Sequence, residues 1–269
     1  MRALLAVLAV CLAAHGPAAR AGADSVFLEE LTSTEVRDAI RAGKTTIIIP
    51  VGGTEQNGPH MALGKHNVRG RVLAGRIAAA LGNALVAPVV AYVPEGNIAP
   101  PGGHMRFAGT ISVSDAAFRG VLEGAARSFR QHGFIDVVLV GEHGDYQGQL
   151  KAVAAKLNLE WKGTPARAHF IEEYYRVTQG AYVKALKEKG LADAQIGTHA
   201  GAADTALSLA IDPALVRPAE RMPGTATEAK AGGVSGDPRA ASAALGQLGV
   251  DLVVAESVAA IRKAQATPR

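Results

Sequence analysis

The stretch 45-TTIIIPVGGTEQNGPHMALGKHN-67 decides the fold, because an apolar run passes directly into a loop rich in glycine and polar side chains. Residues 45–52 are continuously apolar rather than alternating, which is typical of a strand covered on both faces of a sheet. The loop that follows carries Glu55 and His66 among glycines and Pro59. These punctuating residues bend the chain, and we expect the bend to bring Glu55 and His66 to one point.

A second apolar run, 135–141, leads in the same way into the polar cluster 142-EHGDYQ-147. Strand-like and helix-like patterns alternate along the chain, and this alternation predicts an α/β fold with a mainly parallel sheet and helices on both faces. Beyond the two apolar runs, we predict a strand at 84–93, a strand followed by a loop at 166–175, and helices at 68–82, 115–133, 150–157, 203–211 and 240–264.

The two polar clusters follow the two clearest strands, and sites in parallel α/β folds lie beyond the carboxyl ends of strands. Four side chains can therefore meet at one edge of the sheet: Glu55, His66, His143 and Asp145. Imidazole nitrogen and carboxylate oxygen together suit zinc, manganese or iron. The spacing is not that of a helical metal motif such as H-E-x-x-H, so two interpretations stay open: a metal site, or loop residues that make turns and bind backbone.

The N-terminus has the pattern of a secretory signal peptide, with Arg2, the apolar run 3–14 and small residues before Ala21. Cleavage after Ala21 would leave 22–269 as a single domain and place the protein in the periplasm or outside the cell. Cys11 is the only cysteine, so the mature chain would have no thiol ligand or nucleophile. Any metal would be held by nitrogen and oxygen.

The charge balance excludes some partners. Removing Arg2 and Arg20 with the signal peptide lowers the formal net charge from +4 to +2, and no basic run remains, so we expect no nucleic-acid partner. No second apolar segment reads as the roughly 20 residues that cross a bilayer, so we also expect no membrane span.

Five segments, in chain order, resemble motifs of the creatininase (creatinine amidohydrolase) family. The resemblance implies a three-layer α/β/α sandwich with a mainly parallel central sheet, a small-molecule amide substrate and a homo-oligomer, commonly a hexamer. Residues 50-PVGGTEQNGPHMALGKH-66 resemble the family's P-x-G-S-x-E-Q-H-G-P-H-L-P-L-x-T-D. The other segments are 104-HMRFAGTIS-112, 132-HGFIDVVLVGEHGD-145, 199-HAGAADTALSLAI-211 and 233-GVSGDPRAAS-242.

The resemblance also implies a dinuclear metal site, but two of its positions differ here. Glu55, His143 and Asp145 keep the ligand types of the family, whereas Asn57 replaces a histidine and His66 replaces a bridging aspartate. A carboxylate can bridge two ions, but a neutral imidazole offers one lone pair. An amide oxygen is also a poorer ligand for zinc than imidazole nitrogen. We therefore expect one ion, Zn or Mn, held by Glu55, His66, His143 and Asp145.

These features predict a metal-dependent amidohydrolase that cleaves a C–N bond in an amide, cyclic amide or formamide with a metal-activated water. The resemblance implies that His199 is the general acid for the leaving nitrogen, and that Asp204 orients it or stabilises its charge. The alternative is a divergent member that binds a ligand or metal without efficient catalysis. His60 would fix its loop or be recruited as a ligand, and His104 would line the pocket or a subunit contact.

Overall fold

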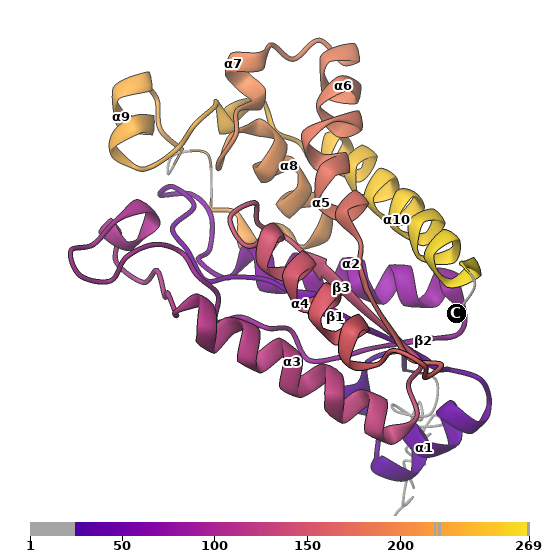
Figure 1. The fold of residues 1–269 in the computed structure, drawn as a ribbon. Coiled ribbons are helices and arrows are strands. Elements are labelled where there is room, and N and C mark those ends of the chain that lie inside the picture. The colour runs from indigo at the N-terminus through magenta and orange to yellow at the C-terminus, as the bar shows by residue number, and fades with distance from the viewer. Residues whose placement is uncertain (1–24, 218, 220–221, 268–269) are drawn as a thin grey trace, which may run out of the picture.

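A computed structural model describes residues 25–217, 219 and 222–267 of the chain, so the expected signal peptide lies outside the described residues. Helices and strands alternate along the first half, and helices dominate the second (Figure 1). The strands are β1 (Thr46–Val51), β2 (Ala84–Val86), β3 (Asp136–Gly141) and β4 (Arg167–Phe170). The helices are α1 (Ser33–Arg41), α2 (Lys65–Leu81), α3 (Asp115–His132), α4 (Gln147–Glu160), α5 (Glu172–Gln179), α6 (Ala181–Glu188), α7 (Asp193–Ile196), α8 (Ala202–Ile211), α9 (Ala226–Ala231) and α10 (Ala243–Ala266).

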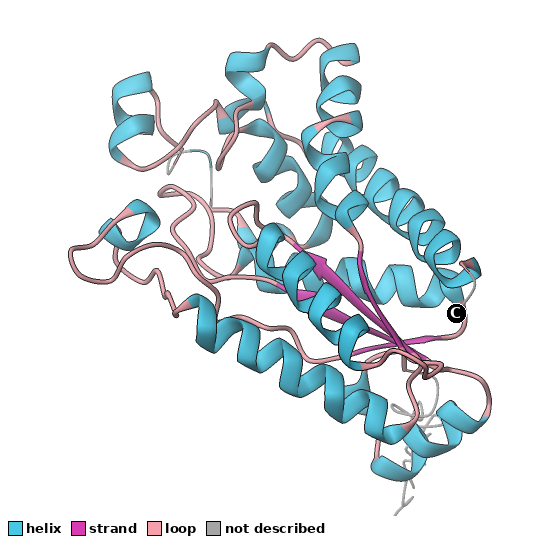
Figure 2. Cartoon of the chain, in the orientation of Figure 1, coloured by secondary structure: helices cyan, strands magenta, loops and turns pink. Residues whose placement is uncertain are grey.

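The strands form one sheet in the order β2-β1-β3-β4, and every neighbouring pair is parallel (Figure 2). In the central pair, Thr46 lies opposite Asp136 and Val51 lies opposite Gly141. The two apolar runs of the sequence are therefore adjacent and end at the same edge. The parallel α/β sandwich predicted from the sequence is confirmed.

Both faces of the sheet are covered, which explains why β1 is apolar throughout. Ile47 and Ile49 pack with α3 and α4 in one part of the core. Ile48 points to the other face, where it packs with residues of α2, α8 and α10. Successive residues of a strand point to opposite faces, so a strand between two helical layers needs an apolar residue at every position. The three layers are visible in Figure 1, with α3 and α4 on one side of the sheet and α2 and α10 on the other.

Two predicted elements differ from the structure. The strand expected at 84–93 ends at Val86, and only an isolated bridge between Val51 and Val90 continues it. Pro88 lies between, and proline has no N–H to donate to a strand ladder. The loop expected after β4 is instead helix α5, whose first turn carries Glu172 and Glu173, where acidic side chains interact favourably with the helix dipole.

Helix α10 corrects our expectation that no second apolar segment reaches bilayer length. Ala243–Gln265 is long and apolar enough to cross a membrane by length and composition alone, with 39% of its apolar window buried. Its Val250, Val253 and Ile261 belong to the core shared with α2 and α8, so we assign it as a core helix.

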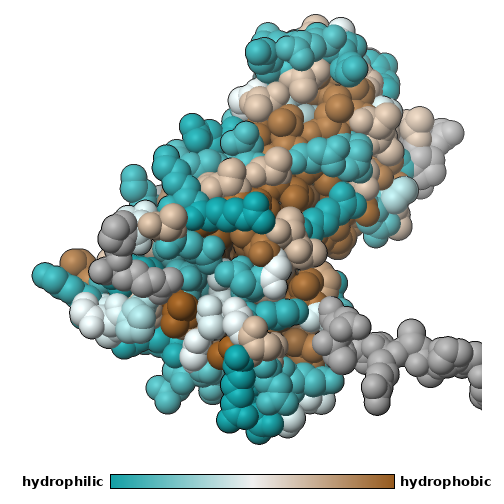
Figure 3. Space-filling view, turned by 90° about the vertical axis from the view of Figure 1, so that its right-hand side faces the viewer, coloured by the Kyte–Doolittle hydropathy of each residue, from teal (hydrophilic) through white to brown (hydrophobic). Residues whose placement is uncertain are grey.

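The face of the molecule on the right of Figure 1 shows hydrophobic side chains between bands of hydrophilic ones (Figure 3).

Helices α8 and α10 approach each other closely at Gly246. A Cβ atom at Gly246 would lie 1.8 Å from the backbone oxygen of Ala206 on α8. Backbone cannot move aside as a flexible side chain can, so a methyl group at this position must push the two helices apart.

We therefore expect Gly246→Ala to lower the free energy of unfolding by about 2–3 kcal/mol, as overpacking of a close contact does. The matched control is Gly120→Ala, at an exposed site inside α3 where a Cβ meets nothing within 4 Å. That change should raise stability by roughly 0.5–1 kcal/mol through helix propensity. Urea denaturation of both variants and wild type measures the change in free energy of unfolding. Equal changes in the two variants would contradict the close contact between α8 and α10.

Candidate metal centre and catalytic pocket

Polar loops converge at the carboxyl edge of the sheet, as the sequence predicted. The backbone N–H of Glu142, directly after β3, donates to the carbonyl of Val51 at the end of β1, at 3.0 Å. The Tyr146 hydroxyl donates to the carbonyls of Val51 and Gly52, at 2.9 and 2.6 Å. It also accepts from the backbone N–H of His143, at 3.0 Å. The two loops therefore leave the sheet as one hydrogen-bonded unit.

Glu55 is the centre of this edge and is fully buried. Its Oε1 lies 2.8 Å from His66 Nε2, and its Oε2 lies 3.3 Å from His104 Nε2 and 3.4 Å from His143 Nε2. Burial alone would raise the pKa of Glu55, but its close contacts with His143 and His66 outweigh burial and hold the pKa below its ordinary value. The carboxylate is therefore charged and surrounded by imidazole rings.

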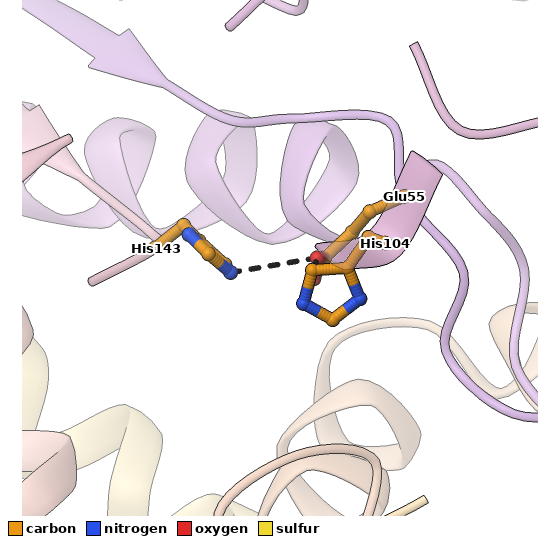
Figure 4. Close-up of side chains that lie close together, drawn as sticks. All are labelled: Glu55, His104 and His143. Atoms are coloured by element: carbon orange, nitrogen blue, oxygen red, sulfur yellow. Dashed lines mark ion pairs between the residues drawn. The ribbon is translucent and has the colours of Figure 1, made fainter. Parts of the chain in front are cut away.

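Three side chains offer ligand atoms that all lie within 4.8 Å of one another: Glu55, His104 and His143. Figure 4 shows the His143 ring facing the Glu55 carboxylate, with the His104 ring close beside that carboxylate. Ligands about 2.0–2.1 Å from a tetrahedral zinc lie roughly 3.3–3.4 Å apart. The separations of 3.3 and 3.4 Å from Glu55 Oε2 match that spacing, so the donors fit a divalent ion.

His66 lies beside this group but not in it. Its Nε2 faces Glu55, and its Nδ1 lies 3.3 Å from Glu142 Oε2. Each ring nitrogen of His66 thus faces a carboxylate oxygen, which can only accept. Asp145 is exposed, and its backbone nitrogen lies 3.3 Å from His143 Nδ1. The geometry thus favours His104, and not His66 or Asp145, as the third ligand beside Glu55 and His143. That His66 and Asp145 bind the metal stays a prediction.

Beyond His66, buried ion pairs continue into helices α2 and α8. Arg69 Nε lies 2.9 Å from Glu142 Oε2, and its Nη1 lies 2.9 Å from Asp204 Oδ1. Lys65, which is fully buried, places Nζ 3.0 Å from Asp204 Oδ2. The Tyr174 hydroxyl also donates to Glu142. Burial alone would raise the pKa of Asp204, but Lys65 and Arg69 hold it well below its ordinary value.

His199 lies at the other side of Glu55, with Nδ1 3.9 Å from Glu55 Oε1. Its Nε2 lies 3.0 Å from the carbonyl oxygen of Gln56, which can only accept, and also 3.0 Å from the side-chain Nε2 of Gln56, which can only donate. The tautomer with the proton on Nε2 satisfies the carbonyl oxygen and leaves the lone pair on Nδ1. Burial and then the charge of Lys65 lower the pKa of His199 to about 4. The ring is therefore neutral at pH 7, so it must first accept a proton before it can act as the general acid that we expected.

Asp204 acts on His199 through the backbone as well as through its charge. Its Oδ2 accepts the N–H of Ala200 at 2.9 Å. Ala200 has φ 55°, a left-handed conformation that costs a residue with a Cβ about 1 kcal/mol or more. The hydrogen bond holds this strained residue directly after His199. Asp204 thus helps to position the backbone of His199, and its charge also acts on the His199 ring.

Two other polar residues of the opening loop have structural contacts. The Asn57 side-chain amide donates to the carbonyls of Glu55 and Ala62, at 2.9 and 3.3 Å. His60 is fully buried, with Nε2 3.1 Å from Thr205 Oγ1, and burial lowers its pKa to about 4. Both residues fix the loop that carries Glu55, which agrees with the first of our two interpretations of His60.

A cavity of about 610 Å³, counting the solvent at its mouth, opens beside the cluster. His143, His199 and Asp204 contribute to its polar part, and Tyr175 and Ile196 to its wall. A small molecule in this cavity could contact both His143 of the metal group and His199.

Sequence reasoning did not assign His104 or Glu95 to the centre. Glu95 follows the β2 segment, is buried, and has Oε2 3.9 Å from His143 Nε2. Burial raises the pKa of Glu95 to about 8. An acid placed shortly after an apolar segment, as Glu55 and Glu142 are, was the signal that could have found it.

A parallel α/β sheet whose carboxyl edge gathers two imidazoles and a carboxylate defines a metal-binding α/β protein. The family model for creatininase, described as creatinine amidohydrolase, matches residues 29–261. The chain belongs to the creatininase family.

Relatives with known names are hydrolases. The chain is 30% identical to creatinine amidohydrolase of Pseudomonas putida over 197 residues, which cover 71% of this chain and 74% of that protein. It is 34% identical to the mycofactocin precursor peptide peptidase of Mycolicibacterium smegmatis over 118 residues, 42% of this chain and 44% of that one. The structure is similar to a creatininase named for Mn, with TM-score 0.74, 26% identity and coverage of 90% and 99% of the two chains. A creatininase mutant named as Zn-Zn type gives TM-score 0.71 at 25% identity, with the same coverage.

Metal affinity should depend on pH through His143. Burial alone would lower the pKa of this ring, but Glu55 raises it to about 9. At neutral pH the metal-free ring therefore carries a proton that an ion must displace. We expect zinc affinity to rise by up to about tenfold per pH unit between about pH 6 and 9 and to level off above.

Competition titration with a chelating dye measures this dependence. Calorimetry in two buffers of different ionisation enthalpy should also detect proton release on binding at pH 7. An affinity that stays constant across this range would contradict the assignment of His143.

Proposed function

We propose that this chain is a metal-dependent amidohydrolase that cleaves a C–N bond of a small molecule, namely an amide, a cyclic amide or a formamide. The observation that carries the proposal is the group of Glu55, His104 and His143, whose spacing fits one divalent ion, next to a cavity lined by His199. The named activity of the Pseudomonas putida relative supports the same bond type. The named peptidase relative, matched over less than half of its length, makes a peptide the second substrate class to test.

We infer that one ion is bound rather than two. A second ion would need further ligands around Glu55, but Asn57 bonds backbone carbonyls and His66 faces two carboxylates. The Lys65 and Arg69 cations already balance the neighbouring acids, Glu142 and Asp204. Zinc and manganese are the metals that this donor set and the related structures support.

A bound divalent ion supplies Lewis acidity toward a carbonyl oxygen and lowers the pKa of water. His199 would move the proton. Its neutral ring accepts one at Nδ1 when water attacks the carbonyl carbon, and the protonated ring then donates it to the leaving nitrogen. Gln56 holds Nε2 of the ring from the opposite side, and the Asp204 contact to Ala200 fixes the backbone. These contacts keep Nδ1 directed at the cluster.

The first test is metal content per subunit by elemental analysis, before and after dialysis against zinc or manganese. We expect a value near one. Glu55→Gln and His143→Ala should remove the ion and lower hydrolysis of cyclic amides and formamides at least ~100-fold. Asn57→Ala is the matched control and should keep the ion. Loss of metal in that control would contradict the assignment, and a loaded protein without turnover on amides, formamides or peptides would favour a binding protein.

We further propose that the mature protein is periplasmic or secreted and forms a homo-oligomer, a hexamer by resemblance to the family. The sequence pattern of residues 1–21 supports export, and the hydrophobic surface in Figure 3 supports assembly. Native mass spectrometry of protein expressed with its full N-terminus tests both. The expected result is a multimer of subunits that begin at Gly22. Monomers that retain Met1 would contradict both proposals.

A further inference from the structure

Glu95 is a buried acid whose side chain makes no hydrogen bond within the described residues. It is 1% exposed. Its backbone N–H donates to Ser112 Oγ at 3.0 Å, so the main chain is held. A Cβ atom at Gly53 would lie 2.6 Å from Glu95 Oε1, which means that the absence of a side chain at Gly53 makes the room for this carboxyl group.

The unpartnered oxygens lie beside the metal group. Glu95 Oε2 is 3.9 Å from His143 Nε2, and that nitrogen is 3.4 Å from Glu55 Oε2. Glu55 Oε2 faces the imidazole rings of His143 and His104, the latter with Nε2 at 3.3 Å, but makes no hydrogen bond of good geometry within the described residues. Burying carboxylate oxygens without a hydrogen bond costs several kcal/mol. Two such groups beside one imidazole are therefore an arrangement that a cation would stabilise.

We propose that Glu95 is a fourth protein ligand of the ion held by Glu55, His104 and His143. This inference rests on the proposed metal-dependent function and adds a residue to its site. Two carboxylates and two neutral imidazoles together offset the charge of a divalent ion. Four protein ligands leave a place for water only when the ion is five- or six-coordinate, which carboxylate-rich sites for manganese allow more readily than tetrahedral zinc sites.

The test compares wild type with Glu95→Gln, measuring the dissociation constants of Mn²⁺ and Zn²⁺ by competition with a chelating dye. Glutamine keeps the shape but resembles the protonated acid. If Glu95 binds the ion as a carboxylate, both constants should rise at least ~10-fold, and that of Mn²⁺ more. If Glu95 stays a neutral acid beside Glu55, glutamine should leave both constants unchanged within about twofold, which overturns the proposal.

Thermal unfolding gives a second readout. Without metal, Glu95→Gln should unfold at the same or a higher temperature, because it removes a buried unpartnered acid. Saturating metal should raise the melting temperature of Glu95→Gln by less than it raises that of wild type. The matched control is Glu123→Gln, a nearly buried acid on α3 that pairs with Lys156 and Arg127. It should leave both dissociation constants unchanged.

Glu95→Asp keeps the charge and guards against misfolding of the glutamine variant. It should bind Mn²⁺ more weakly than wild type but more tightly than Glu95→Gln. If both folded variants bind Mn²⁺ as tightly as wild type does, the proposal is wrong. Failure of the proposed function is distinguishable: in that case wild type itself binds neither ion.

Discussion

The burial of one carboxylate, Glu55, is the constraint on which the rest of the site depends. A charged group removed from water must be surrounded by donors or cations, and Glu55 has imidazole nitrogens on both of its oxygens. Those rings come from helix α2, from the glycine-rich loop and from the end of β3. The parallel pairing of β1 and β3 brings these distant segments together, so the sheet and the site specify each other.

Charge alternates outward from Glu55 through the interior. An acid is followed by His66, then by Glu142, then by Arg69 and by Asp204, with each step at 3.3 Å or less. The network fixes the direction of every side chain in it, because each group is held from two sides. Such preorganisation keeps one part of the cavity rigid, while the opposite wall is built from short helices and their loops.

Hydrophobic periodicity and loop composition predicted the central strands and the polar residues that follow them. Continuous apolar runs identified β1 and β3, and the residues that follow them identified Glu55 and His143. For His104 the sequence predicted only that it lines the pocket or a subunit contact. A long loop between β2 and α3 brings it to the site, and the path of that loop depends on tertiary packing, which the sequence pattern does not show. Lys65 and Arg69 were missed for another reason. Charged residues four apart on a helix usually face solvent, and only the acid at Asp204 shows that these two are inside.

The position of His66 between two acids has a consequence for ion binding. A carboxylate at this position would stand directly against Glu55 and Glu142, so three buried acids would meet where one imidazole ring now separates two. A bridging acid at position 66 therefore requires a compensating change at position 142, so the ion-binding capacity of this edge is set by pairs of residues and not by single ligands.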